Sequence, residues 1–151
     1  MKILVDADAT PAKALIEQVA RRHAVPLVFV ANHNHTLHSE YARLVVVDAD
    51  NDAADYRLVS IVASGDIVIT QDYGLAALML AKEANVIHPN GWTYTNANIE
   101  EKLAQRHQAA KERRRTGRFS HIRPRKNKDD QKLIAVLTAL IQDKRGKPRH
   151  D

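Results

Sequence analysis

Residues 2–10 read KILVDADAT, an apolar run that ends at Asp6 and is followed by a second aspartate, Asp8. A short apolar run that stops at a charge is typical of a strand buried in a sheet. A helix is then expected over residues 11–23, with its proline in the first turn and Thr10 as the N-cap. The stretch therefore predicts a strand–helix unit with carboxylates where the strand ends.

The same alternation of apolar runs and amphipathic segments continues to about residue 88. Strands are expected over residues 26–31, 43–48, 66–70 and 85–88, and helices over residues 52–64 and 73–84. Strands that alternate with helices imply parallel pairing through right-handed crossovers. We therefore predict an α/β protein with three α/β/α layers around a central parallel sheet of about five strands.

The rest of the chain is expected to complete a single domain over residues 1–151. A helix should run from Thr95 or Asn96 into residues 111–115. A basic loop is placed over about 111–131, and a last helix should cover about 132–143. The apolar stripe of that last helix consists of Leu133, Leu137, Leu140 and Ile141. The stripe is expected to pack on the domain, whereas an exposed stripe would indicate a homo-oligomer.

The composition excludes several classes of protein. Without cysteine, the chain forms neither disulfides nor thiolate metal sites. It has no apolar run near the ~20 residues of a membrane span and no secretory signal, so a cytoplasmic location without a membrane partner is expected. Residues 1–100 carry 12 acidic and 7 basic side chains, and residues 101–151 carry 6 and 16. This asymmetry favours an acidic site beside a polyanion-binding segment, although a solvated basic tail would look the same.

Aspartates recur at or just beyond the ends of the predicted strands. Asp6 ends the first strand, Asp55 opens the helix after the third, and Asp72 lies two residues beyond the fourth. Because the carboxyl ends of parallel strands share one edge of a sheet, these three side chains are expected to meet there. Three other nearby acids, Asp48, Asp50 and Asp66, are expected to be helix caps or solvated loop ends. Asp52 is expected to be the N-cap of the helix over residues 52–64.

Converging carboxylates repel one another, by several kcal/mol for two charges ~4 Å apart at an effective dielectric constant near 20. The group must either keep protons or bind a cation. Ligands that are all oxygen favour Mg²⁺ or Mn²⁺. The sequence therefore predicts a divalent-metal site at Asp6, Asp55 and Asp72.

These residues, in their order along the chain, resemble the YaiI/YqxD family of bacterial proteins. The segments that carry the resemblance are Ile3–Ala9 with Pro11, Val30–Asn32, Asp52–Val59, Gly65–Asp72 with Leu75-Ala76, and His88–Gly91 with Tyr94-Thr95. The similarity covers nearly the whole chain. Members of the family usually carry cysteine where this chain has Thr10, which argues against a thiol in the mechanism.

The family is similar in turn to the PIN-like superfamily, whose better-known members are metal-dependent ribonucleases. The resemblance implies that Asp6, Asp55 and Asp72 hold Mg²⁺ or Mn²⁺, with Asp8 in a supplementary role. It also implies that Thr70 orients a carboxylate or a water molecule. The expected activity is hydrolysis of phosphodiester bonds, with RNA as the favoured substrate.

A basic segment follows the predicted sheet, because residues 111–128 hold nine Lys or Arg and one acid. Phe119 and His121 interleave with these charges, and such rings can stack on bases. This pattern predicts contact with single-stranded nucleic acid, RNA favoured, through Arg113, Arg114, Arg115, Arg118, Arg123, Arg125 and Lys126. Asn32 and His33 are expected at the rim of the substrate site.

Three other interpretations stay open. The opening DADAT, residues 6–10, also resembles the phosphatases of the haloacid dehalogenase superfamily, in which the first aspartate is a nucleophile; their later acidic pair is matched only by Asp129-Asp130. The fold could instead bind RNA or a partner with an inactive acidic pocket. The histidines His33, His35 and His38 would form a zinc site only with further ligands, which the sequence does not reveal.

Overall fold

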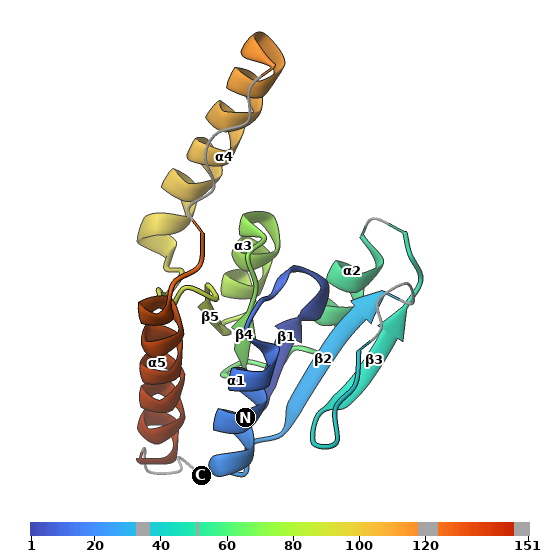
Figure 1. Ribbon diagram of the computed structural model, residues 1–151, viewed down its shortest axis with the longest axis vertical. Coiled ribbons are helices and arrows are strands. Elements are labelled where there is room, and N and C mark those ends of the chain that lie inside the picture. Colours follow the sequence, from blue (N-terminus) through green and yellow to red (C-terminus); the bar gives the residue numbers. More distant parts are fainter. Residues whose placement is uncertain (33–36, 51, 118–123, 147–151) are drawn as a thin grey trace.

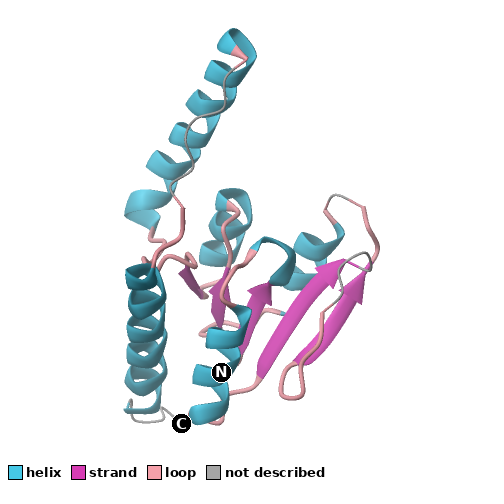
Figure 2. Ribbon diagram, in the orientation of Figure 1, coloured by secondary structure: helices cyan, strands magenta, loops and turns pink. Residues whose placement is uncertain are grey.

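The computed structural model of the protein describes residues 1–32, 37–50, 52–117 and 124–146. Its elements in chain order are β1 (Ile3–Asp6), the 3-10 turn η1 (Ala7–Ala9), α1 (Lys13–Arg22), β2 (Leu27–Asn32), β3 (Arg43–Val47), α2 (Ala53–Ile61), β4 (Ile67–Ile69), α3 (Tyr73–Ala81), β5 (Asn85–Ile87), α4 (Asn96–Thr116) and α5 (Asn127–Gly146). The strands form one parallel sheet between helical layers (Figures 1 and 2), so the predicted three-layer α/β/α fold is confirmed.

The strand order reverses its direction of growth beside β1, which is therefore at the topological switch point of the sheet. The sheet runs β3-β2-β1-β4-β5, so the central strand β1 pairs with β2 on one side and with β4 on the other. In open parallel sheets, ligands bind outside the carboxyl ends of the strands at such a switch point. Any site of this kind would therefore lie where β1 and β4 end.

Each central strand is buried on both faces. In β1, Ile3 and Val5 belong to one apolar cluster and Leu4 to the other. The first cluster is completed by α1 and α5, and the second by α2, α3 and the start of α4. A parallel sheet covered on both faces requires apolar side chains at every position of its central strands, which explains the uninterrupted run in residues 3–5.

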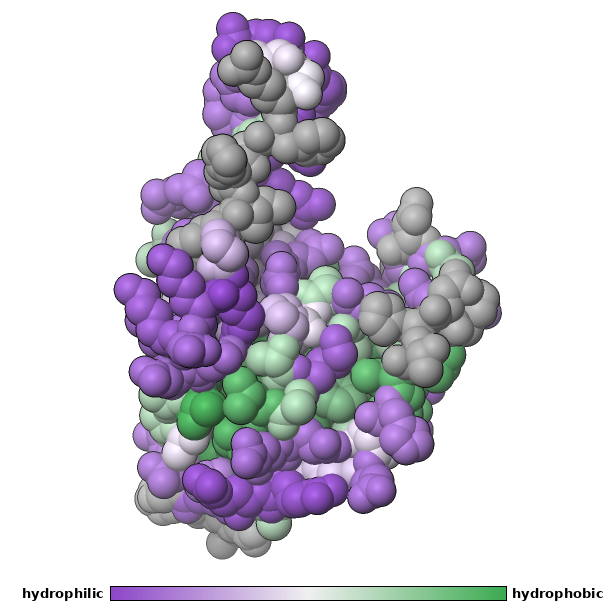
Figure 3. Space-filling model, in the orientation of Figure 1, coloured by the Kyte–Doolittle hydropathy of each residue, from purple (hydrophilic) through white to green (hydrophobic). Residues whose placement is uncertain are grey.

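Helix α4 projects from the body (Figure 1). Ile99 and Leu103 near its start pack into the second apolar cluster, whereas residues 111–117 are all exposed. A capping box formed by Thr95 and Asn98 begins the helix, and Gly117 ends it with a φ of +69°. On the face seen in Figure 3, most of the coloured surface of the projecting part is hydrophilic. None of the helices in the described ranges is long and apolar enough to cross a membrane.

The basic segment differs from its prediction. The helix expected to run into residues 111–115 is α4, which ends at Thr116, and α5 begins at Asn127 rather than near residue 132, so the two helices take up both ends of the basic loop expected over about 111–131. The outer half of α4 has no apolar stripe, so hydrophobic periodicity does not show where the helix ends. On α5, Leu133, Leu137 and Ile141 are buried in the first cluster and the partly buried Leu140 packs against it, so this stripe belongs to the core, as expected.

Two expectations for single residues are wrong. Thr10 does not cap α1: because η1 intervenes, Ala12 is the N-cap, and the Thr10 hydroxyl donates to the carbonyl oxygen of Asp6 at 2.6 Å. Asp66 is neither a cap nor solvated, since it is 3% exposed and accepts from Lys2 Nζ at 2.6 Å and from the amide of Ala63 at 2.8 Å. Thr10 therefore binds the end of β1, and Asp66 joins the start of β4 to Lys2 and to the loop after α2.

Candidate functional site

A cleft of about 410 Å³ opens at the edge of the sheet where the strands end. The residues that line it are Asp6, Asp8, Asn32, Ala49, Asp50, Asp52, Ala54, Asp55, Asp72 and Arg106. The three aspartates expected to meet, at positions 6, 55 and 72, therefore share one cleft. They arrive from the end of β1, from α2 and from the loop after β4.

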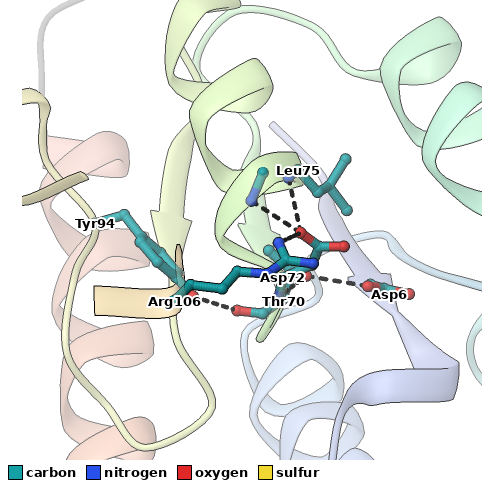
Figure 4. A network of polar contacts seen from close by, with 7 residues as sticks. Asp6, Thr70, Asp72, Leu75, Tyr94 and Arg106 are labelled. Carbon is teal, nitrogen blue, oxygen red and sulfur yellow. Dashed lines mark hydrogen bonds and ion pairs between the residues drawn. The ribbon is translucent and has the colours of Figure 1, made fainter. Parts of the chain in front are cut away.

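Thr70 links the two strands at the switch point (Figure 4). This fully buried side chain donates through Oγ1 to Asp6 Oδ2 at 3.0 Å, and Oγ1 accepts from the backbone amide of Asp72 at 3.0 Å. One hydroxyl therefore fixes a carboxylate at the end of β1 and the backbone of the loop after β4.

Asp72 is the N-cap of α3. Its Oδ1 accepts from the backbone amides of Gly74 at 2.8 Å and Leu75 at 3.2 Å, and Arg106 Nη1 lies 3.3 Å from the same oxygen (Figure 4). Amides at a helix N-terminus stabilise a negative charge. Because these bonds all use Oδ1, the second oxygen, Oδ2, takes part in none of them.

The acids of the cleft interact electrostatically. Burial, opposed by the Thr70 hydrogen bond and reinforced by Asp55, Asp72 and Asp8, raises the pKa of Asp6 from 3.8 to about 6. Burial and the charges of Asp72 and Asp52 also raise the pKa of Asp55. Each carboxylate therefore makes ionisation of the next less favourable, and a cation would relieve this repulsion.

Replacing Thr70 with valine is expected to raise the pKa of Asp6 further, because the hydroxyl stabilises the ionised carboxylate. The loss of two buried hydrogen bonds should also lower the free energy of unfolding by about 1–3 kcal/mol. NMR titration of the side-chain carboxyl carbons would measure the pKa, with Thr70→Ser as the control that keeps the hydroxyl. An unchanged pKa in Thr70→Val would contradict the role assigned to this bond.

Other predicted rim residues divide into described and undescribed positions. The backbone amide of Asn32 donates to Asp8 Oδ2 at 2.8 Å, so the end of β2 positions Asp8. Asp52 occupies the N-cap position of α2, as expected, without a side-chain capping bond, and Asp50 is an exposed loop residue, as expected. Both also line the cleft. His33 and His35 lie outside the described residues.

Arg106 is a cleft residue that the pattern of strand ends does not reveal. It reaches the site from α4, because that helix packs against α3. The available signal was its spacing: Ile99, Leu103 and Arg106 follow at intervals of four and three residues, which places them on one helix face. A basic residue that follows Ile99 and Leu103 on the same face of α4 is expected where the helix leaves the apolar core.

The residues predicted to contact nucleic acid fall into exposed residues, one residue bound within the protein, and residues outside the described ranges. Arg113, Arg114 and Arg115 form the exposed last turn of α4, and Lys126 is exposed before α5. Arg118 and Arg123 lie outside the described residues. Arg125 is engaged within the protein, since its guanidinium bonds Asp130 at 2.6 Å and the carbonyl oxygen of Pro89 at 2.6 Å.

The donor set suits a hydrated hard cation better than a closed metal cage. Within the described ranges, no group of three or more His, Asp or Glu side chains is arranged to hold a metal ion directly. Structural zinc needs four such ligands, whereas Mg²⁺ keeps several waters and is bound through one or two carboxylates. The all-oxygen chemistry at Asp6, Asp55 and Asp72 fits the latter kind of site.

Fold and cleft together define a class: a parallel α/β/α protein with a carboxylate-lined cleft at its switch point. A model of the family described as Uncharacterized BCR, YaiI/YqxD family matches residues 4–143. The chain therefore belongs to the YaiI/YqxD family, which its motifs resembled.

Bacterial relatives match over almost their full length. The UPF0178 protein of Alkaliphilus oremlandii is 47% identical over 143 residues, which are 95% of this chain and 92% of the relative. The UPF0178 protein of Natranaerobius thermophilus is 45% identical over 141 residues, 93% and 96% of the two chains. That of Ruminiclostridium cellulolyticum is 40% identical over 149 residues, 99% and 97%. No solved structure matches the chain.

Proposed function

We propose that this protein is a Mg²⁺- or Mn²⁺-dependent nuclease of PIN-like type that hydrolyses phosphodiester bonds in single-stranded RNA. One observation carries the proposal: Asp6, Asp55 and Asp72, far apart in sequence, line one cleft at the switch point of the sheet. Burial, reinforced by the charges of the neighbouring acids, raises the pKa of Asp6 to about 6. A site that gathers several carboxylates in one cleft is suited to a divalent cation.

The cation would polarise a phosphoryl oxygen and lower the pKa of a water nucleophile. The chain's own residues would hold and orient it. Asp6 at the end of β1 and Asp55 on α2 would hold a hydrated cation, in part through its water molecules, with Asp72 offering Oδ2 and Asp8 in a supplementary role. Thr70 keeps the Asp6 carboxylate in one orientation through its hydrogen bond.

Helix α4 would guide the substrate to the cleft. Arg113 lies seven residues beyond Arg106, hence on the same face of the helix and about 10 Å farther along its axis. Arg106 lines the cleft, and Arg113 belongs to the exposed basic turn at the end of α4. A phosphate backbone that follows this face would bind in a salt-dependent manner, with a log–log slope of about −0.7 per phosphate neutralised.

The alternative of an aspartyl phosphatase requires a second acidic pair near Asp6, and Asp129-Asp130 does not lie there. Asp129 is buried and accepts from the backbone amide of Lys126 at 2.9 Å, while Asp130 forms an ion pair with Arg125. Neither lines the cleft, and no lysine does so among the described residues. The carboxylates that interact with Asp6 come instead from η1, from α2 and from the N-cap of α3: Asp8, Asp55 and Asp72.

The proposal is tested by RNA cleavage with Mn²⁺, Mg²⁺ or EDTA. Cleavage of a single-stranded RNA should require the metal, and Asp72→Asn should lower its rate by about 10²–10³-fold, as loss of one group in a charge-stabilising site does. Asp48→Asn is the matched control, because Asp48 is exposed and does not line the cleft.

Equal rates in the wild-type protein and Asp72→Asn, or equal rates with and without EDTA, would remove the catalytic claim. RNA binding that persists under those conditions would then favour the non-catalytic binding module. A phosphorylated Asp6 trapped with a phosphate ester would favour the phosphatase.

A further inference from the structure

A second hollow, of about 350 Å³, adjoins the acidic cleft. It is lined by Ala9, Gln71, Asp72, Tyr73 and Arg106. Asp72 and Arg106 line both spaces, so their ion pair forms the wall between them. The volume lies in the ~300–1,000 Å³ range of small-molecule sites.

The two hollows differ in chemistry. The first is lined by six aspartates, which only accept hydrogen bonds when ionised and repel anions. The second is lined by an aromatic residue, Tyr73, by Gln71 and by Ala9, with one carboxylate paired to a guanidinium. Aromatic rings bind the flat faces of nucleobases irrespective of sequence, and a glutamine amide both donates to and accepts from a base edge.

The ring of Tyr73 is held in place by other rings. Its centroid lies 5.9 Å from that of Tyr94 and 6.4 Å from that of Trp92. Tyr94 is fixed through its hydroxyl, which donates to the carbonyl oxygen of Thr70 at 3.1 Å, and Trp92 stacks on His88 at 4.6 Å. A ring fixed before binding loses little conformational freedom when a base packs on it.

Arg106 is suited to receive a phosphate group. In the described part of the chain it is the one basic residue that lines either hollow. Its side chain is 58% exposed, and its ion pair with Asp72 is 3.3 Å long and involves a single nitrogen of the guanidinium. Exposed pairs of this kind are weak, and the planar guanidinium binds phosphate through two parallel hydrogen bonds.

We propose that the second hollow is a nucleotide subsite, in which the base packs on Tyr73 and the attached phosphate is bound by Arg106 at the border of the acidic cleft. The inference rests on the proposed nuclease function, because it makes this nucleotide the neighbour of the cleaved bond. No aromatic ring is among the residues that line the acidic cleft, so it offers a base no ring to stack on. Without a bound cation the carboxylates also repel a phosphate from the interior of the acidic cleft, so the phosphate attached to this base is placed at the Asp72–Arg106 wall.

Binding can be tested separately from cleavage, in EDTA, by NMR titration with adenosine 5′-monophosphate, adenosine, ribose 5-phosphate and the dinucleoside phosphate ApA. Trp92 is the single tryptophan and gives one indole N–H signal; the amide of Gly74, which donates to Asp72 Oδ1, reports on the wall. The monophosphate should shift both signals and bind about tenfold more tightly than adenosine. Ribose 5-phosphate should shift the Gly74 signal alone, and ApA should bind at least as tightly as the monophosphate.

Substitutions assign the two halves of the subsite. Arg106→Gln should reduce the affinity for the monophosphate about tenfold, to that of adenosine, whereas Arg57→Gln, at an exposed arginine of α2, should not change it. Tyr73→Leu should weaken the monophosphate and adenosine alike, by about tenfold, while Tyr73→Phe keeps the ring and the affinity. Thermal melts of each variant separate loss of binding from loss of fold.

Equal affinity for the monophosphate in Arg106→Gln and the wild type, or equal loss in Tyr73→Phe and Tyr73→Leu, would overturn the subsite. Binding of the monophosphate without binding of ApA would show a site for free nucleotides and would also overturn it. Metal-dependent RNA cleavage without monophosphate binding rejects the subsite alone. Monophosphate and ApA binding without any metal-dependent cleavage rejects the nuclease and leaves a nucleotide-binding site.

Discussion

Asp6→Asn is expected to lower RNA cleavage by at least about a hundredfold and, at the same time, to make the folded protein more stable at neutral pH. The first effect follows from loss of a carboxylate proposed to hold the metal. The second follows from burial and from the neighbouring acids, which raise the pKa of Asp6 from 3.8 to about 6 in the folded state. The native state therefore keeps the Asp6 proton to higher pH than the unfolded chain does.

The sign of the pH dependence follows from that difference. Between pH 4 and 6 the native state binds more protons than the unfolded state, so the wild-type protein loses stability as the pH rises. The loss amounts to about 2–3 kcal/mol and is complete above pH 6. Asparagine keeps an oxygen acceptor for Thr70 and carries no charge, so Asp6→Asn should escape this loss.

Denaturant unfolding at pH 4 and pH 7 would measure the effect. At pH 7, Asp6→Asn should be the more stable protein, while at pH 4 the two should be nearly equal. Asp48→Asn, at an exposed carboxylate, should show no such difference. If Asp6→Asn were less stable than the wild type at pH 7, lost cleavage could reflect unfolding and the electrostatic account of the cleft would be wrong.

Gly91→Ala is expected to lower the free energy of unfolding by about 3 kcal/mol or more. Gly91 has a φ of +90°, and a Cβ atom there would lie 2.4 Å from Lys132 Cβ and 2.6 Å from the amide nitrogen of Leu133. The clash involves the backbone of α5, which cannot move without disturbing the buried Leu133. The melting temperature should fall by roughly 6–12 °C, at 2–4 °C for each kcal/mol in a domain of this size.

Gly117→Ala is the matched control for backbone conformation. Gly117 also has a positive φ, +69°, but a Cβ atom there would meet nothing within 4 Å. The control should therefore lose only the backbone contribution, about 1–2 kcal/mol. Equal destabilisation of the two variants in thermal melts would show that close approach to α5 contributes nothing at Gly91.

The sheet and the meeting of its acids were predictable because they depend on backbone topology alone. Once β1 and β4 are recognised as neighbouring parallel strands, Asp6 and Asp72 must emerge at one edge. The N-cap of α1 was not predictable. Thr10 is of a residue type that favours N-caps, but because η1 precedes it, its hydroxyl donates to the carbonyl oxygen of Asp6 instead. Local preference there is overridden by the loop that shapes the cleft.

The remaining differences arise from contacts between distant segments. Arg106 enters the cleft only because α4 crosses α3, a packing that no strand-end pattern contains. Arg125, which looked like one more free cation in a basic run, is bound to Pro89 and Asp130 because α5 docks beside the turn that follows β5. A charge run in the sequence therefore does not separate cations that face solvent from those that join elements.

The place of α5 in the core has a consequence for synthesis on the ribosome. β1 emerges early, yet the layer over its Ile3 and Val5 is completed by Leu133, Leu137 and Ile141, near the other end of the chain. At about 5–20 residues per second, the roughly 130 residues between them take on the order of ten seconds to translate. During that interval one side of the sheet is left partly uncovered, so the nascent chain presents an apolar surface that chaperones can bind.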